Sequence, residues 1–171
     1  MNGISFIREL DLYKKIYSLE TISCDNSVDE SFFNCVTSKS YYIILILYNK
    51  LGQIYLKSSG INHYQLLSVN VDPNKTIRDN VKRGISAIGI SSSIEALEPI
   101  CFIKQTYHFG KEIFTHNGIA LMVQISYDQT VPFYSLTDDM LNKFDMFADK
   151  QILSIYMKRY YSILQQNLGN F

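Results

Sequence analysis

Residues 64–90 read YQLLSVNVDPNKTIRDNVKRGISAIGI, and this stretch decides the fold. Its first part, QLLSVNV at 65–71, predicts a short strand or extended loop, which the turn-forming sequence Asp72-Pro73-Asn74 ends. A helix is then predicted over 76–89, with Thr76 as its N-cap and a glycine at its end. Four aliphatic side chains recur at i, i+4, i+8 and i+11 and are expected to be buried: Ile77, Val81, Ile85 and Ile88.

Hydrophobic patterns on either side of this stretch predict further strands and helices. The run YYIILILY at 41–48 is typical of a strand buried on both faces, and we expect it to form a hairpin with the run after Gly52. Residues 21–38 are polar and turn-rich, which predicts a loop or a weak strand. Further strands are predicted at 99–109 and 118–127, and helices at 4–20, from Thr137-Asp138-Asp139 onward and at 149–167. This order predicts a mixed α/β domain with helices on both faces of its sheet.

Composition limits the classes of function. With 171 residues, 47% of them hydrophobic, the chain suits one domain with a sizeable core. The net charge is zero, so we expect no general attraction to DNA or to an anionic membrane. Cys24, Cys35 and Cys101 lack metal-type spacing and are expected to be reduced thiols. The N-terminus does not resemble a signal peptide, and the longest apolar run is too short to cross a bilayer. The sequence therefore predicts a cytoplasmic protein with no membrane and no DNA partner.

The order of these residues resembles the Nudix hydrolase family over roughly 39–165. The matching positions are Tyr64, Leu66, Val71, Asp72, Pro73, Thr76, Val81, Arg83, Ile85 and Gly89-Ile90, with one residue deleted near the helix end, and then 116–121 (HNGIAL) and 147–150 (FADK). The resemblance implies a Nudix-like α/β/α sandwich with a mixed β-sheet between helices. It divides the chain into an N-terminal helix and loop extension at 1–38 and a Nudix-like domain at 39–171 that includes the C-terminal helix, within one domain overall. The alternative is an unrelated α/β domain with a capped helix.

The departures from the family concern its chemistry. The resemblance implies that helix glutamates hold a divalent metal, usually magnesium, which activates water for attack on a diphosphate. In this chain the corresponding helix positions are Gly84, Ala87 and Ile88, and the upstream glutamate position is Lys75. The paired glycines of the loop are replaced by Ser68-Val69. We therefore expect no metal, no cofactor and no catalytic residue in this degenerate Nudix box.

Other candidate residues are few. Asp72 is interpreted as a turn acid and Asp79 as an acid in the first helical turn. The three histidines lack zinc-site spacing; His108 and His116 either line a substrate cleft or are loop residues satisfied by water. Three acids could supply a relocated base or be surface acids: Glu95, Glu98 and Glu112.

Four basic residues replace the acidic surface of the family: Lys75, Arg78, Lys82 and Arg83. They form either a solvated face or a set of phosphate contacts that needs no metal, and we name them as the candidate ligand-binding residues. Tyrosines of the last helix are expected to be core residues, with base stacking or dimer contact as alternatives: Tyr156, Tyr160 and Tyr161.

Two functions from different classes follow. The first is a catalytically inactive Nudix-fold protein that serves as a binding or regulatory module for a nucleotide-like or other phosphate-bearing ligand, or for a protein partner, with a homodimer as one arrangement. The second is a metal-dependent Nudix hydrolase of nucleoside diphosphate-linked substrates that uses relocated acids. A purely structural subunit is a third interpretation.

Overall fold

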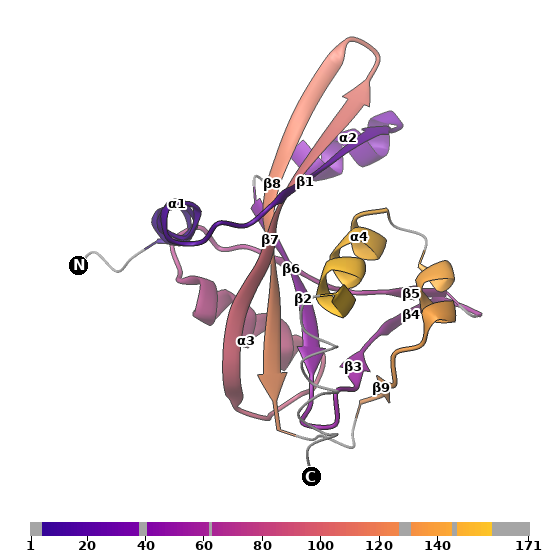
Figure 1. Cartoon of the computed structure of the whole chain (residues 1–171). Coiled ribbons are helices and arrows are strands. Elements are labelled where there is room, and N and C mark those ends of the chain that lie inside the picture. The colour runs from indigo at the N-terminus through magenta and orange to yellow at the C-terminus, as the bar shows by residue number, and fades with distance from the viewer. Residues whose placement is uncertain (1–4, 38–40, 62, 127–130, 145–146, 159–171) are drawn as a thin grey trace.

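The computed structural model describes residues 5–37, 41–61, 63–126, 131–144 and 147–158, and Figure 1 shows its arrangement. In chain order the elements are α1 (Phe6–Ile16), β1 (Thr21–Ser27), α2 (Glu30–Thr37), β2 (Tyr41–Tyr48), β3 (Ile54–Tyr55), β4 (Lys57–Gly60), β5 (His63–Gln65), β6 (Leu67–Asn70), α3 (Ile77–Ala87), β7 (Ile94–Phe109), β8 (Glu112–Ile125), β9 (Phe133–Tyr134), the 3-10 helix η1 (Asp138–Lys143) and α4 (Phe147–Tyr156).

The main sheet is mixed, as the sequence predicted. Its strand order in the described residues is β1-β7-β8-β2-β3-β9, with β6 also paired to β2. β2 is parallel to β8 and antiparallel to β3 and β6, while β1 is parallel to β7. The long antiparallel hairpin of β7 and β8 extends beyond the body of the protein, where α2 and β1 accompany it (Figure 1).

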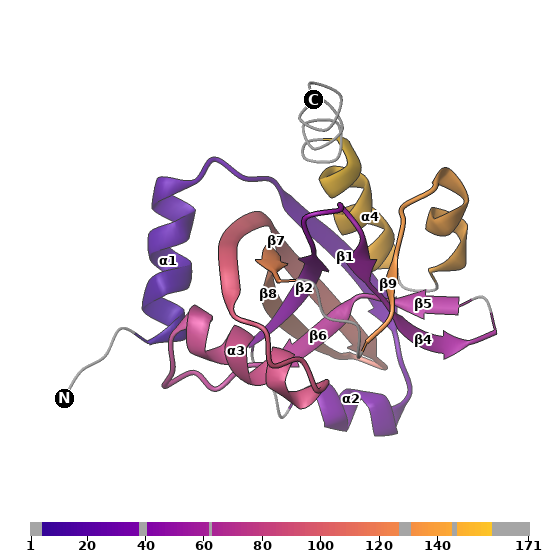
Figure 2. The same ribbon diagram turned by 90° about the horizontal axis from the view of Figure 1, so that it is seen from below.

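Helices cover both faces of this sheet, which confirms the predicted sandwich. Figures 1 and 2 show α1 and α3 on one side of the sheet and α4 on the other. Strand β2 supplies both cores by alternation: Ile43, Leu45 and Leu47 pack with α3, whereas Ile44 and Ile46 pack with α4. The run at 41–48 is therefore buried on both faces, as its composition predicted.

Helix α3 forms where the sequence predicted it. The Thr76 hydroxyl accepts a hydrogen bond from the Asp79 backbone N–H at 3.1 Å, and Gly89 follows the helix with a φ of +86°. Three of the predicted core residues, Ile77, Val81 and Ile85, are buried. Burying each side chain contributes about 1.5–3 kcal/mol of stability. Ile88 is only partly buried because it lies at the C-cap.

The N-terminal segment differs from the predicted helix and loop. Helix α1 is shorter than predicted, and strand β1 realises the weak strand of the prediction. The second half of 21–38 is helix α2 rather than loop, with Phe32 packed on Tyr107 (5.4 Å between ring centroids) and Phe33 on Phe109 (5.8 Å). Short-range patterns cannot show such contacts, because they join α2 to a hairpin about 75 residues further along the chain.

Helix α1 also contacts the start of α3. The Glu9 carboxylate accepts a hydrogen bond from the Ile77 backbone N–H at 2.7 Å, and the Phe6 backbone N–H donates to the Pro73 carbonyl at 3.3 Å. A carboxylate at a helix N-terminus satisfies a backbone donor and interacts favourably with the helix dipole. The N-terminal helix therefore stabilises the position of the box.

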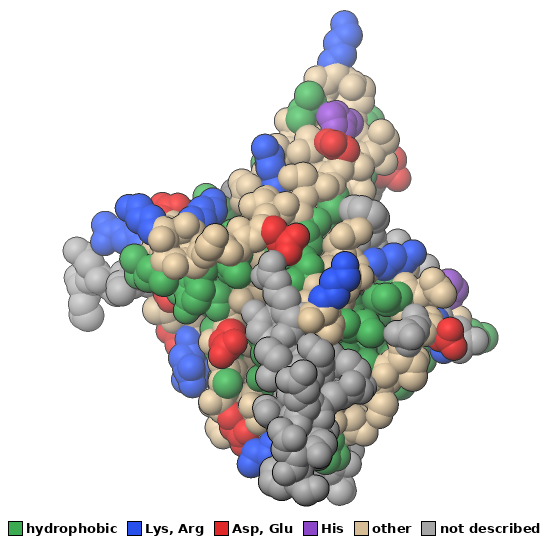
Figure 3. Space-filling view, viewed as in Figure 1, with side chains coloured by type: hydrophobic (Ala, Val, Ile, Leu, Met, Phe, Trp, Pro, Cys, Tyr) green, Lys and Arg blue, Asp and Glu red, His purple; other side chains and the backbone are tan. Residues whose placement is uncertain are grey.

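The helices predicted in the C-terminal part of the chain are confirmed where the structure describes them. The short helix predicted after Thr137 is η1, and α4 begins the predicted terminal helix, in which Tyr156 is a buried core residue. Tyr160 and Tyr161 lie outside the described residues. No described helix has the length and apolar character needed to cross a membrane. Acidic and basic side chains are interspersed over the face seen in Figure 3.

Candidate functional site

Residues of the predicted box line a cavity of about 570 Å³ between β6 and α3, which we call the box cavity. The expected glutamate positions Gly84, Ala87 and Ile88 all line it, together with Arg83. Asp72 is the one carboxylate among its lining residues. Within the described residues no group of three or more His, Cys, Asp and Glu side chains could hold a metal ion. The residues of this cavity therefore do not fit the magnesium site that the resemblance implies.

One glutamate position is also closed sterically. A Cβ atom at Gly84 would overlap Cγ2 of Val69 and lie 3.0 Å from its Cγ1. Val69 stands where the family has a loop glycine, and its side chain is buried against α3. The valine in β6 and the glycine in α3 are thus complementary, and a larger side chain at either position requires a change at the other.

A buried asparagine holds the box turn. Asn80 Oδ1 accepts hydrogen bonds from the Asp72 N–H at 2.8 Å and from Arg83 Nη2 at 2.9 Å, and its Nδ2 donates to the Thr76 carbonyl at 2.9 Å. Asp72 is a turn acid, as predicted: its Oδ1 accepts from the Asn74 N–H at 3.0 Å. Side-chain hydrogen bonds of Asn80 and Asp72 therefore fix this turn. Sequence reasoning missed Asn80, although it is the one amide on the face that also carries Ile77, Val81 and Ile85.

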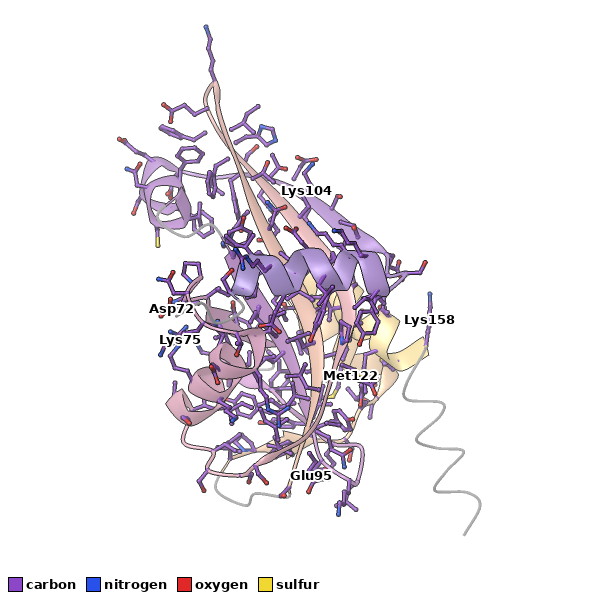
Figure 4. The ribbon with its side chains drawn as sticks, turned by 90° about the vertical axis from the view of Figure 1, so that its left-hand side faces the viewer. Asp72, Lys75, Glu95, Lys104, Met122 and Lys158 are labelled. Carbon is purple, nitrogen blue, oxygen red and sulfur yellow. The ribbon has the colours of Figure 1, made fainter. Side chains whose placement is uncertain are left out.

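The structure separates the four candidate basic residues. Lys75 is exposed in the turn before α3 (Figure 4). Arg78 and Lys82 line a different cavity, of about 290 Å³, with the serines at 91–93. Arg83 alone of the four lines the box cavity. The four residues therefore do not form one surface, and their role as ligand contacts stays a prediction.

A second cavity, of about 240 Å³, lies on the opposite face of the sheet beneath α4, and we call it the sheet cavity. It shares Ser68 and Asn70 of β6 with the box cavity, so the two cavities are adjacent. Its other polar lining residues come from β2, β5, β7, β8 and α4: Tyr42, Gln65, Gln105, Tyr107, His116 and Asp149. An apolar cavity wall with a few convergent polar groups is typical of a small-molecule site.

Asp149 is a buried carboxylate in this cavity. It lies in the first turn of α4, and its Oδ2 accepts a hydrogen bond from the Leu66 backbone N–H at 3.1 Å. Burial raises the pKa of Asp149 to about 6, and the hydrogen bond from Leu66 opposes that shift. A carboxyl group that ionises near neutral pH can accept or donate a hydrogen bond to a ligand. The sequence drew attention to Asp149 only as part of the 147–150 match.

Tyr42 supplies the second buried group. Its hydroxyl has no hydrogen-bond partner within the described residues, although the side chain is only 6% exposed. Its ring packs on His116, with 4.4 Å between the ring centroids, and burial raises the pKa of the phenol. Gly118, opposite Tyr42 on β8, permits this arrangement, because a Cβ there would lie 2.8 Å from the ring. An unsatisfied buried hydroxyl is destabilising and calls for an explanation.

The histidine alternatives are resolved differently for the two residues. His116 is 7% exposed and lines the sheet cavity, so the interpretation as a water-satisfied loop residue is wrong for it. His108 lies on the projecting part of the hairpin, where its Nε2 is 3.2 Å from Asp25 Oδ1, and it does not line this cavity. The Tyr107 hydroxyl donates to Gln105 Oε1 beside His116. Sequence reasoning missed Tyr107 and Gln105.

The candidate relocated acids line neither the box cavity nor the sheet cavity. Glu95 is at the start of β7, where its carboxylate accepts from Gln124 Nε2 at 3.1 Å and from the Ser126 hydroxyl at 2.9 Å (Figure 4). Glu112 is at the other end of the long hairpin, paired with Phe109. Glu98 is exposed on β7.

Solved structures similar to this chain carry the same fold. The NUDIX domain of Shewanella oneidensis NrtR, complexed with ADP ribose, matches with a TM-score of 0.51 at 12% identity, over 71% of this chain and 88% of that one. A NUDIX hydrolase from Nitrosomonas europaea matches with a TM-score of 0.50 at 11% identity, over 70% and 89% of the two chains. No protein-family model matches the sequence, and no match was found among curated proteins. The chain has a Nudix-like fold, as its sequence predicted.

Proposed function

We propose that this protein is a catalytically inactive Nudix-fold binding module for a nucleotide-like ligand. The uncharged, heterocyclic end of the ligand occupies the sheet cavity, and its phosphate is held by basic residues of 75–83. The observation that carries the proposal is the pair of buried groups in the sheet cavity, the unpartnered Tyr42 hydroxyl and the Asp149 carboxyl. A heterocycle edge with neighbouring hydrogen-bond donors and acceptors would satisfy both groups.

Charge supports this orientation of the ligand. A phosphate placed beside Asp149 would meet a carboxylate that is ionised above about pH 6. The box cavity contains Arg83 and adjoins the sheet cavity at Ser68 and Asn70, so one ligand can reach both. The NrtR domain of the same fold binds ADP ribose, which supports a ligand of this size and class. The predicted protein partner, homodimer and cytoplasmic location stay predictions.

The chemistry that hydrolysis requires supports the proposed inactivity. A metal ion normally neutralises the diphosphate and activates the attacking water, and the box positions offer no carboxylate set for one. The alternative hydrolase would depend on Glu95, Glu98 or Glu112, whose positions on the hairpin do not converge on either cavity.

The binding test is calorimetric titration of ADP-ribose, nucleoside diphosphates and dinucleoside polyphosphates in the presence and absence of magnesium. We expect saturable binding to the wild type and its loss in Ser68→Trp, which fills the rim shared by the two cavities. The matched control is Ser23→Trp, an exposed serine of strand β1 that lines none of the three cavities, for which affinity should be unchanged. Absence of binding by every ligand of the panel would overturn the proposal.

The activity test is a substrate panel with magnesium or manganese, on the wild type and on the Glu95/Glu98/Glu112 triple alanine variant. We expect no turnover from either protein, and no manganese binding at submillimolar concentration. Turnover in the wild type that is lost in the triple variant would establish the alternative hydrolase. Manganese affinity that disappears in Asp72→Asn or Asp79→Asn would show a metal site in the box.

A further inference from the structure

The exposed side chain of Arg83 lines the box cavity, and two hydrogen bonds orient its guanidinium group. Its Nη2 donates to Asn80 Oδ1 and to the Asn70 backbone carbonyl, and Asn80 is itself fully buried. Both acceptors are neutral. Asp79 lies one helical turn before Arg83 on α3, yet no ion pair joins the two side chains among the described residues. The guanidinium is therefore oriented by amide groups of α3 and β6.

The positive charge of Arg83 is not neutralised by the protein. In the part of the chain that the structure describes, the two hydrogen bonds to Asn70 and Asn80 are those of its guanidinium, and no carboxylate forms an ion pair with it. A guanidinium carries five N–H donors in a planar fork that matches phosphate oxygens. Two of these donors serve the fold, and three have no acceptor among the described residues.

The negative charge of Asp72 opposes phosphate binding at Arg83, because its carboxylate also lines the box cavity. That carboxylate is engaged in its own turn, where Oδ1 accepts from the Asn74 N–H at 3.0 Å. In a metal site Asp72 would be the remaining ligand and its removal would weaken binding. In a site built on Arg83 it would repel the phosphate, and its removal would strengthen binding. A metal site and a site built on Arg83 therefore predict opposite changes in phosphate affinity when the Asp72 carboxylate is removed.

We propose that the box cavity is a metal-free phosphate subsite in which the Arg83 guanidinium binds the diphosphate of the ligand in place of a divalent cation. The inference rests on the proposed function and narrows its four basic candidates to one. Arg78 and Lys82 line another cavity and Lys75 is in the preceding turn, so they make at most a long-range contribution that salt screens.

The experiment compares each nucleoside diphosphate with its nucleoside: ADP with adenosine, GDP with guanosine and UDP with uridine, by calorimetry in chelator and in magnesium. We expect the diphosphate to bind wild type more tightly than the nucleoside, equally well with and without magnesium. Arg83→Met should weaken diphosphate binding at least about tenfold, the effect of losing a hydrogen bond to a charged group, and leave nucleoside affinity within about twofold. Asp72→Asn should strengthen diphosphate binding about threefold.

Two variants keep the result interpretable. Arg8→Met makes the same change on the exposed surface of α1, outside the three cavities, and should leave both affinities unchanged. Arg83→Lys retains the charge without the fork and should give an intermediate affinity, and its nucleoside affinity reports whether the protein is folded. Four results would overturn the inference while leaving the proposed function standing. The first two are equal affinity for nucleoside and diphosphate, and diphosphate binding that requires magnesium. The other two are weaker diphosphate binding by Asp72→Asn, and a tenfold loss of diphosphate affinity in Lys82→Met without one in Arg83→Met. Failure of both members of every pair to bind would overturn the proposed function with it.

Discussion

The box cavity and the sheet cavity meet at β6, yet they differ in whether their buried polar groups have hydrogen-bond partners. In the box, every hydrogen-bonding atom of the Asn80 side chain has a partner, and Gly84 and Val69 fill the space that a glutamate would need. In the sheet cavity, the Tyr42 hydroxyl has no partner among the described residues, and Asp149 retains a carboxylate where ionisation is unfavourable. Satisfied groups stabilise a fold, whereas unsatisfied ones are destabilising unless a ligand completes them. The difference supports a division of the proposed binding role, in which the box offers the ligand only the Arg83 charge and the sheet cavity offers the contacts with its heterocycle.

The largest expected effect tests whether the box is closed to its former chemistry. Gly84→Glu places a Cβ against Val69 and should lower the free energy of unfolding by at least about 3 kcal/mol, from overpacking and from the buried carboxylate. Urea unfolding followed by circular dichroism measures this. Ala87→Glu introduces the same residue at an exposed box position and should change stability by less than about 0.5 kcal/mol. Adding Val69→Gly to Gly84→Glu should relieve the overlap, and equal destabilisation by the two glutamate variants would contradict the steric argument.

The second effect tests whether Asn80 replaces a metal in holding the turn. Asn80→Ala leaves the Asp72 N–H and the Thr76 carbonyl without their side-chain partners and should reduce the free energy of unfolding by about 2–3 kcal/mol. Chelator and magnesium should leave the melting temperature of wild type unchanged. Asn74→Ala, an exposed residue of the same turn, is the control and should be nearly neutral. A melting temperature that rises with magnesium would show that the box still depends on a metal.

The third effect concerns Asp149 and has a defined pH dependence. Its pKa is raised to about 6 in the folded protein, from a usual value near 3.8. The unfolded chain therefore loses its proton first as pH rises, and stability should fall between about pH 4 and pH 6 and then level off. Asp149→Asn keeps an oxygen for the Leu66 N–H without the charge, so it should stabilise the protein by about 2 kcal/mol at pH 7.5 and flatten that slope. Chemical denaturation across pH measures both quantities, and a destabilised Asn variant would mean that the carboxylate has a structural role.

The fold could be predicted from the sequence because local patterns determine it. The spacing of Ile77, Val81 and Ile85, the Thr76 cap and the apolar run at 41–48 each specify an element without knowledge of the rest. The absence of glutamates at the expected box positions could also be read directly from the sequence. The sheet cavity was not predictable, because Tyr42 and Asp149 come from β2 and α4 and meet only through the topology. One sequence shows residue types and spacing, and it does not show which distant side chains converge.

The smallest expected effect tests the unpartnered hydroxyl group of the sheet cavity by removing a single atom. Tyr42→Phe removes a buried hydroxyl that has no partner in the described residues, so the unfolding free energy should stay the same or rise by up to about 1 kcal/mol. Tyr107→Phe is the matched control, because that hydroxyl donates to Gln105 within the same cavity, and its loss should lower stability by about 1 kcal/mol. Both proteins can be compared with wild type by urea unfolding, and the opposite sign of the two changes is the result to look for. Nucleoside affinity supplies the second measurement: Tyr42→Phe should weaken it although the fold gains stability, because the hydroxyl is kept for the ligand. If Tyr42→Phe destabilises as much as Tyr107→Phe, the Tyr42 hydroxyl serves the fold, and the proposed role of the sheet cavity in binding loses its main support.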